Sequence, residues 1–184
     1  MSYPIPTSEL TLTDTKTFRG GAIEAGIARA LKLAIASNRE ELVVYEALPN
    51  TNFGVALYLT EQYITPAPAA VGWASAGSGA GVGTLPVGQV AVFYKAANSS
   101  AVVPPVFIAC RFRIGLTGSS TKAVFHMQLA IENKVESDVY FSEPVVYDPN
   151  DRLFIQVYST AAAGAAENFS FGCFIVSRLG PEIS

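Results

Sequence analysis

Residues that could carry out chemistry are few in this chain, and the first to consider is its single histidine, His126. Any histidine-dependent triad or general base would have to use it. It stands between Phe125 and Met127 in an alternating apolar run, and the sequence contains no Gly-x-Ser-x-Gly nucleophile turn. We therefore interpret His126 as a structural residue of a strand and predict that the protein is not an enzyme.

The two cysteines, Cys110 and Cys173, both fall within apolar runs. We interpret them as small buried hydrophobic residues. A disulfide between them would require adjacent strands, which the sequence does not decide. One histidine and two cysteines are too few for the usual zinc site. We expect neither a metal nor a cofactor.

Paired carboxylates occur at Glu40/Glu41 and at Asp148/Asp151. A glycosidase would need two carboxylates that face each other across a groove, about 5–10 Å apart. The segment 148–151, Asp-Pro-Asn-Asp, is instead typical of a turn, because Asp and Asn bond their own backbone and Pro fixes φ. A loose cation site through these oxygens is the weaker alternative, since the spacing is not that of an EF-hand.

The glycine-rich run 77–83 is superficially similar to a nucleotide-binding loop. It is followed by Thr84-Leu85-Pro86 in place of Gly-Lys-Ser/Thr, and no helical pattern comes next to direct an N-terminus at a phosphate. We interpret the whole segment 65–85, which contains the only tryptophan, Trp73, as a long loop that is exposed or packed on a neighbouring subunit.

Length and charge limit the partners. At 184 residues the chain fits one domain. Charged residues make up 15% of it, with a net charge of −3, whereas about 25% is typical. The scarcity of lysine and arginine argues against nucleic acid as a partner.

No apolar run reaches the roughly 18 residues that would cross a membrane, and the N-terminus lacks a signal-peptide pattern, so we expect no export. Low charge favours a homo-oligomer whose subunits cover one another.

The elements that position these residues are predicted to be mainly strands, with turn signals about every ten residues. The alternating apolar runs are 41–48, 53–64, 88–96, 106–115, 123–132, 139–147, 152–160 and 168–177. Pro144 marks one of them as an edge strand or a bend, and the segment 98–100 predicts a turn. The pattern predicts an all-β fold, an antiparallel β-sandwich or jelly roll of about eight strands.

Within the run 106–115, alternation places Cys110, Phe112 and Ile114 on one face. Arg111 and Arg113 lie on the other, where they are solvated or meet acidic groups across a subunit contact. Eight tyrosines and eleven phenylalanines could form a sugar-binding platform. Most of them alternate within strands, as a sandwich core requires, so we favour core packing.

The N-terminal part differs from the rest. Residues 1–21, rich in proline and threonine, predict an extended arm without a core of its own. Residues 22–38 predict the one helix, and 22–184 a single sandwich domain. Gly26 weakens the helical pattern. A helix docked on the sandwich is preferred over a membrane-active or partner-binding one. Its apolar stripe consists of Ile23, Ile27, Ala30, Leu31, Ala34 and Ile35.

This combination of an arm, a short helix and a Gly/Ala/Ser-rich sandwich resembles the capsid decoration (cement) proteins of tailed bacteriophages. The resemblance covers the whole chain as architecture, and the segments 151–158 and 171–176 look like closing strands of such sandwiches. It implies a protein made in the host cytoplasm and located on the capsid surface of the virion. There it would bind the major capsid protein, often as a homotrimer, with its arm attached to the shell.

The resemblance also indicates which residues would make these contacts. Those expected to touch the capsid are the arm residues Tyr3, Pro4, Ile5, Leu10, Leu12 and Phe18. Those expected to touch a neighbouring subunit are the loop residues Trp73, Val82 and Leu85. Two alternatives stay open: a single-jelly-roll capsid protein that forms the shell itself, and a receptor-binding or carbohydrate-binding sandwich.

Overall fold

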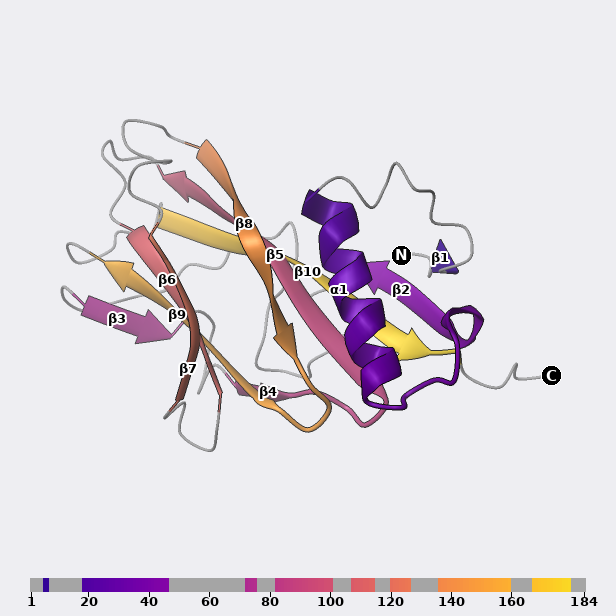
Figure 1. The fold of residues 1–184 in the computed structure, drawn as a ribbon. Coiled ribbons are helices and arrows are strands. Elements are labelled where there is room, and N and C mark those ends of the chain that lie inside the picture. Colours follow the sequence, from indigo (N-terminus) through magenta and orange to yellow (C-terminus); the bar gives the residue numbers. More distant parts are fainter. Residues whose placement is uncertain are drawn as a thin grey trace.

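The computed structural model describes residues 5–6, 18–46, 72–75, 82–100, 107–114, 120–126, 136–159 and 167–179. Within these residues the chain forms two antiparallel β-sheets and one α-helix, α1 (Phe18–Lys32) (Figure 1). The first sheet, sheet A, contains β1 (Ile5–Pro6), β2 (Leu42–Glu46), β5 (Gln89–Ser100), β8 (Glu136–Tyr147) and β10 (Glu167–Arg178). The second, sheet B, contains β3 (Gly72–Ser75), β4 (Val82–Thr84), β6 (Phe107–Ile114), β7 (Ser120–His126) and β9 (Arg152–Ser159).

The predicted antiparallel β-sandwich is confirmed. Sheet A has the strand order β1-β2-β10-β5-β8, and sheet B has the order β3-β9-β6-β7, with β4 also paired to β9. Seven of the described strands have five or more residues, and β1, β3 and β4 are shorter. The predicted strand 53–64 lies outside the described residues.

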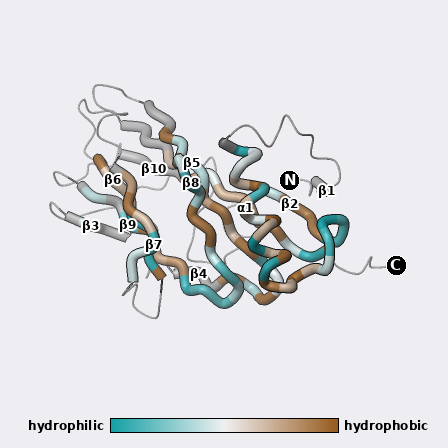
Figure 2. The backbone as a smooth tube through the Cα atoms, in the orientation of Figure 1, coloured by the Kyte–Doolittle hydropathy of each residue, from teal (hydrophilic) through white to brown (hydrophobic). Residues whose placement is uncertain are grey.

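Sheet A is the middle layer because both of its faces are apolar. In β5, Val90 and Val92 lie in the core between α1 and sheet A, whereas Ala91 and Phe93 lie in the core between the two sheets. Period-two alternation along one strand therefore supplies both cores. Figure 2 shows the hydrophobic residues of these strands and the hydrophilic loop that joins α1 to β2. The layer order is helix, sheet A, sheet B (Figure 1).

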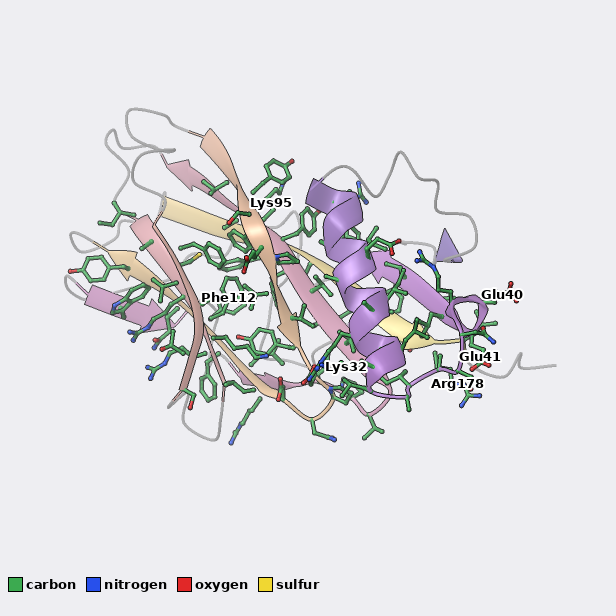
Figure 3. All side chains as sticks on the ribbon, in the orientation of Figure 1. Lys32, Glu40, Glu41, Lys95, Phe112 and Arg178 are labelled. Carbon is green, nitrogen blue, oxygen red and sulfur yellow. The ribbon has the colours of Figure 1, made fainter. Side chains whose placement is uncertain are left out.

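The core between the sheets is centred on aromatic rings. Phe112 of β6 is fully buried and points from sheet B toward sheet A (Figure 3). Its ring lies 5.1 Å from that of Phe93 and 5.7 Å from that of Phe171, measured between centroids. Edge-to-face and tilted contacts of this kind add to the burial energy of each ring. Most aromatic residues of the described strands thus serve packing, as the alternation predicts.

The helix begins at Phe18 rather than Ala22 and ends at Lys32 rather than Asn38. Ala34 adopts a left-handed φ of 54°, which ends the helix. The amide of Ile35 donates to the carbonyl of Ala30, and the amide of Ala34 donates to that of Leu31, both at 3.0 Å. These two bonds form a Schellman motif, so Ala34 is exposed instead of continuing the apolar stripe.

Gly26 lies where the helix comes closest to sheet A. A Cβ at this position would be 2.6 Å from a Val176 methyl carbon and 2.7 Å from one of Val92. Glycine lowers helix propensity but lets the two backbones approach. Gly26, which weakened the helical prediction, is therefore the residue that allows α1 to pack closely on sheet A.

Three predicted features of the strands need correction or refinement. The segment 65–85 is not a continuous loop, since it contains β3 and β4. Residues 98–100 are not a turn, because β5 continues through Ser100, which pairs with Glu167. Strand β8 lies at the edge of sheet A, and its register with β5 shifts around Pro144, so both the predicted edge and the bend are found.

The turn between β8 and β9 ties the layers together. The carboxylate of Asp148 accepts hydrogen bonds from the Nε, at 2.6 Å, and from a terminal nitrogen of Arg29 on α1. The carboxylate of Asp151 accepts one from the amide of Asp148 at 2.9 Å and lies 3.7 Å from the Nζ of Lys122 on β7. The predicted turn chemistry of this segment is confirmed, and one turn contacts the helix and both sheets.

Candidate functional site

The two outer faces of the sandwich differ in how they are covered. Helix α1 packs against β5, β8 and β10 and so covers sheet A. Among the described elements, none packs on the outer face of sheet B (Figure 1). In the part of the chain that the structure describes, no helix is long and apolar enough to cross a membrane. The outer face of sheet B is therefore the candidate site.

Four side chains form a cluster on this face, which we call the Trp73 cluster. Its members are Trp73 of β3, Arg111 of β6, and Gln156 and Tyr158 of β9. Strand register brings them together, because Trp73 is paired with Tyr158 and Arg111 with Gln156. Since paired residues share a face of a sheet, the cluster follows from the strand order.

Arg111 is held in place by its neighbours. Its guanidinium lies 4.3 Å from the centroid of the Trp73 ring, and its Nε donates to the Oε1 of Gln156 at 2.7 Å. The Trp73 ring in turn meets the Tyr158 ring edge to face, with centroids 5.3 Å apart. Cation–π stacking and one hydrogen bond fix the plane of the guanidinium and leave its two terminal nitrogens for another acceptor.

The Trp73 cluster carries positive charge that no described carboxylate balances. Partial burial lowers the pKa of Arg111, and the positive charge of Arg113, two residues along the same strand, lowers that pKa further. No ion pair joins Arg111 to a carboxylate within the described part of the chain. The positive charge of the Arg111 guanidinium on this half-buried face favours the approach of an anion.

A second aromatic group closes the core between α1 and sheet A. The rings of Tyr94 and Phe174 are stacked with centroids 4.9 Å apart, and the Arg19 guanidinium lies 5.1 Å from the Phe174 ring. Burial raises the pKa of Tyr94, and the nearby Glu46 carboxylate raises it further. A Cβ on Gly172 would be 2.7 Å from the Tyr94 ring, so this glycine makes room for it. The group is buried, and its role is packing.

Among the side chains that the structure describes, the residues considered for catalysis form no catalytic arrangement. His126 is the last residue of β7, and its side chain lies outside what the structure describes. Cys110 and Cys173 are buried, as predicted, and both are free, which answers the question that the sequence left open. Burial raises the pKa of both thiols, which keeps them unreactive. The described residues hold no group of three or more potential metal ligands from His, Cys, Asp and Glu.

Glu40 and Glu41 belong to a short 3-10 helix, Arg39–Glu41, beside Arg178 (Figure 3). The amide of Glu41 donates to the side chain of Asn38 at 3.2 Å, and the carboxylate of Glu41 accepts from the amide of Ser37 at 3.1 Å. Asn38 is thus the N-cap of this helix, and the Glu41 carboxylate bonds back to the residue before the cap, so these carboxylates serve local structure.

The residues predicted to contact the capsid or a neighbouring subunit lie in several different elements, and some lie outside the described residues. Ile5 lies in β1, which pairs with β2, and Phe18 is the first residue of α1, so the helix takes the last residues of the predicted arm. Tyr3, Pro4, Leu10 and Leu12 lie outside the described residues. Trp73 lies in β3 and Val82 in β4.

Leu85 was predicted to contact a neighbouring subunit, and this is wrong. Its side chain is fully buried in the core between the sheets. The reason is local: its amide donates to the carbonyl of Asp151 at 3.1 Å, and its carbonyl accepts from the amide of Asn150 at 2.9 Å. The β8–β9 turn therefore fixes the backbone of Leu85 next to the core.

The sequence predicted Arg111 on the face away from the core but not its partners. Trp73 is 38 positions away from Arg111, and Gln156 is 45 positions away, so only the order and register of the strands reveal the contacts. No local signal encodes that register.

No protein-family model matches the chain, and no curated protein matches its sequence. Similar solved structures include the D431N mutant VP2 protein of infectious bursal disease virus in derived T=1 particles, with a TM-score of 0.36 and 8% identity. That match covers 74% of this chain and 31% of VP2, so the chain spans about a third of VP2.

Another is the CBM36-1 domain of a multidomain xylanase from the hindgut metagenome of Trinervitermes trinervoides. Its TM-score is 0.31 with 8% identity, and the match covers 76% of this chain and 99% of that domain. At this similarity neither structure assigns a function to the chain.

Proposed function

We propose that the chain is a non-enzymatic structural protein of a virus particle, a decoration protein that binds between major capsid subunits and stabilises the shell. The observation that supports this most is the pairing of β1 with β2. Ile5 pairs with Val44 and Pro6 with Val43, so a segment of the predicted arm adds a strand to the edge of sheet A. Here the pairing is made within one chain; in the proposed assembly, arms that add to sheet edges in this way would link neighbouring molecules.

The physics of such attachment requires no catalytic group. A protein that binds the assembled shell but not free subunits stabilises the shell by mass action. Weak contacts that are repeated by symmetry act together through their high effective concentration. A homotrimer on the capsid surface would present three arms to the major capsid protein. The low charge of the chain, 15% of its residues, agrees with extensive contact between proteins.

The first test measures the mass of the purified full-length protein by light scattering, alone and after mixing with capsids of its virus that lack it. A stable trimer that binds these capsids is the expected result. Deletion of residues 1–6 is expected to abolish capsid binding and leave the protein folded. Leu179→Ala, which changes an exposed residue of the opposite terminus, serves as the control and is expected to bind normally. A monomer that leaves the capsids bare would refute the proposal.

The same experiment tests the shell-forming alternative. A single-jelly-roll capsid protein would assemble into closed particles without other proteins, and electron microscopy of the purified chain would show them. Electron micrographs without particles, recorded at concentrations where the trimer is stable, would exclude shell formation by this chain alone.

A carbohydrate-binding sandwich is the second candidate, and one observation favours it. The Trp73 cluster places two aromatic rings, one guanidinium and one amide on the open face of sheet B. Aromatic surfaces with a few fixed polar groups are typical of small-ligand sites. This candidate predicts that the isolated protein binds a sugar, whereas a decoration protein need not.

A further inference from the structure

The Trp73 cluster contains a guanidinium whose position is fixed before any ligand arrives. Stacking on Trp73 and the hydrogen bond from Nε to Gln156 hold Arg111 in one plane. Neither contact involves the two terminal nitrogens, which form the edge that pairs with a carboxylate through two parallel hydrogen bonds. Of the described residues, no acidic one contacts Arg111, so its positive charge is not neutralised within the described part of the chain.

We infer that the Trp73 cluster on the outer face of sheet B binds a carboxylate-bearing sugar, such as a hexuronic acid residue of an acidic polysaccharide. The terminal nitrogens of Arg111 would receive the carboxylate. The ring of Trp73 or Tyr158 would contact the apolar face of the sugar ring, since their edge-to-face arrangement presents aromatic surface beside the guanidinium.

The geometry favours a sugar over an acidic protein segment. A peptide is usually recognised by addition of a strand at a sheet edge or by pockets that take its side chains. The cluster instead extends across the face of the sheet, from β3 through β9 to β6. The Arg111 guanidinium attracts a ligand that carries a negative charge more strongly than a neutral one.

Tryptophan fluorescence reports this site alone, because Trp73 is the only tryptophan in the chain. The experiment titrates the full-length protein with a short oligogalacturonate and, in parallel, with its methyl ester, in which each carboxylate is replaced by a neutral methyl ester. A polyglutamate peptide of similar charge forms the third arm. We expect a saturable fluorescence change with oligogalacturonate, at least tenfold weaker binding of the ester, and no change with polyglutamate.

Three single-residue variants test whether oligogalacturonate binds at Arg111. Arg111→Gln is expected to weaken binding of oligogalacturonate at least tenfold, because it removes a charge-assisted pair of hydrogen bonds. Arg178→Gln removes the same charge from an exposed position of sheet A and is expected to change nothing. Gln156→Glu would supply an internal carboxylate to Arg111 and is expected to block the ligand in a protein whose fold is checked by circular dichroism.

The inference is overturned by any of four results: no fluorescence change with oligogalacturonate, equal binding of the ester, unaltered binding by folded Arg111→Gln or Gln156→Glu, or binding of polyglutamate only. The last result would identify the face as a contact for acidic protein. The titration uses the isolated protein, so its outcome does not depend on whether the chain attaches to capsids.

Discussion

The seating of helix α1 on sheet A can be tested by adding one methyl group at Gly26. A Cβ there would lie 2.6 Å from Val176 and 2.7 Å from Val92, whereas ordinary contact begins at 3.4 Å. Both valines are fully buried, and their branched side chains have little rotameric freedom. The helix would therefore have to move out by about 0.8 Å, the difference between 2.6 Å and 3.4 Å.

That displacement loosens the packing of Ile23, Ile27 and Ala30, the helix residues buried against the sheet. A radial gap of roughly 0.5–1 Å forfeits a quarter to a half of each dispersion contact, and overpacked cores typically lose about 1–3 kcal/mol. Replacing glycine by alanine in a helix returns about 1 kcal/mol. The expected net loss of unfolding free energy for Gly26→Ala is about 0–2 kcal/mol, or a fall in Tm of up to roughly 8 °C.

Gly21 is a matched control in the same helix, because a Cβ there would meet nothing within 4 Å. Gly21→Ala is expected to stabilise the protein by about 0.5–1 kcal/mol, the opposite sign. Urea unfolding followed by circular dichroism measures both. In addition, Val176→Ala should rescue part of the Gly26→Ala loss, since it removes the closer methyl group. If Gly26→Ala stabilises the protein as much as Gly21→Ala does, the helix is not seated on these valines and the three-layer packing is wrong.

Three further predictions concern stability and reactivity. Ala34→Gly relieves a left-handed φ of 54° and should raise the unfolding free energy by about 0.5–1 kcal/mol, as measured by urea unfolding; a loss would contradict the Schellman cap. Arg29 lowers the pKa of Asp148, so the pair stabilises the fold above the unfolded carboxyl pKa, about 3.9, and this contribution disappears as pH falls through the lower, folded pKa. Asp148→Asn should therefore cost about 1 kcal/mol at neutral pH and progressively less in acid, and a cost independent of pH would refute the ion pair. Cys110 and Cys173, both buried, should react with a thiol reagent only at the rate of unfolding, and rapid labelling of the native protein would show that the core between the sheets is open.

Alternation along each strand was enough to predict the fold class and the two faces of β6, because successive side chains of a strand point to opposite faces of the sheet. Helix α1 was found but displaced, since its end is set by the left-handed Ala34, a conformation that alanine seldom adopts and that its sequence does not signal. Strands β3 and β4 were missed because they lie in a segment rich in glycine and alanine and take their order from pairing with β9.

The same limit explains why the candidate site was only half predictable. Arg111 could be assigned to the face away from the core from its own strand, but Trp73 could be assigned only to a loop. Their contact depends on β9, which pairs with β3 on one side and with β6 on the other. Pairwise register between distant strands is set by the burial of whole faces, and no short motif encodes it.

The outer faces of the two sheets both follow from strand alternation, but α1 covers that of sheet A and no described element covers that of sheet B. Sheet A presents Val92 and Val176 outward, and the chain supplies α1, with Gly26 at the closest point, to cover them. Sheet B presents Trp73 and Arg111 outward, residue types that tolerate water yet bind strongly when covered. An apolar face is stabilised when it is covered, here by α1 of the same chain, whereas a face with aromatic and cationic side chains tolerates water until a partner binds. Whether that partner is a sugar or another protein, its contact is expected on sheet B.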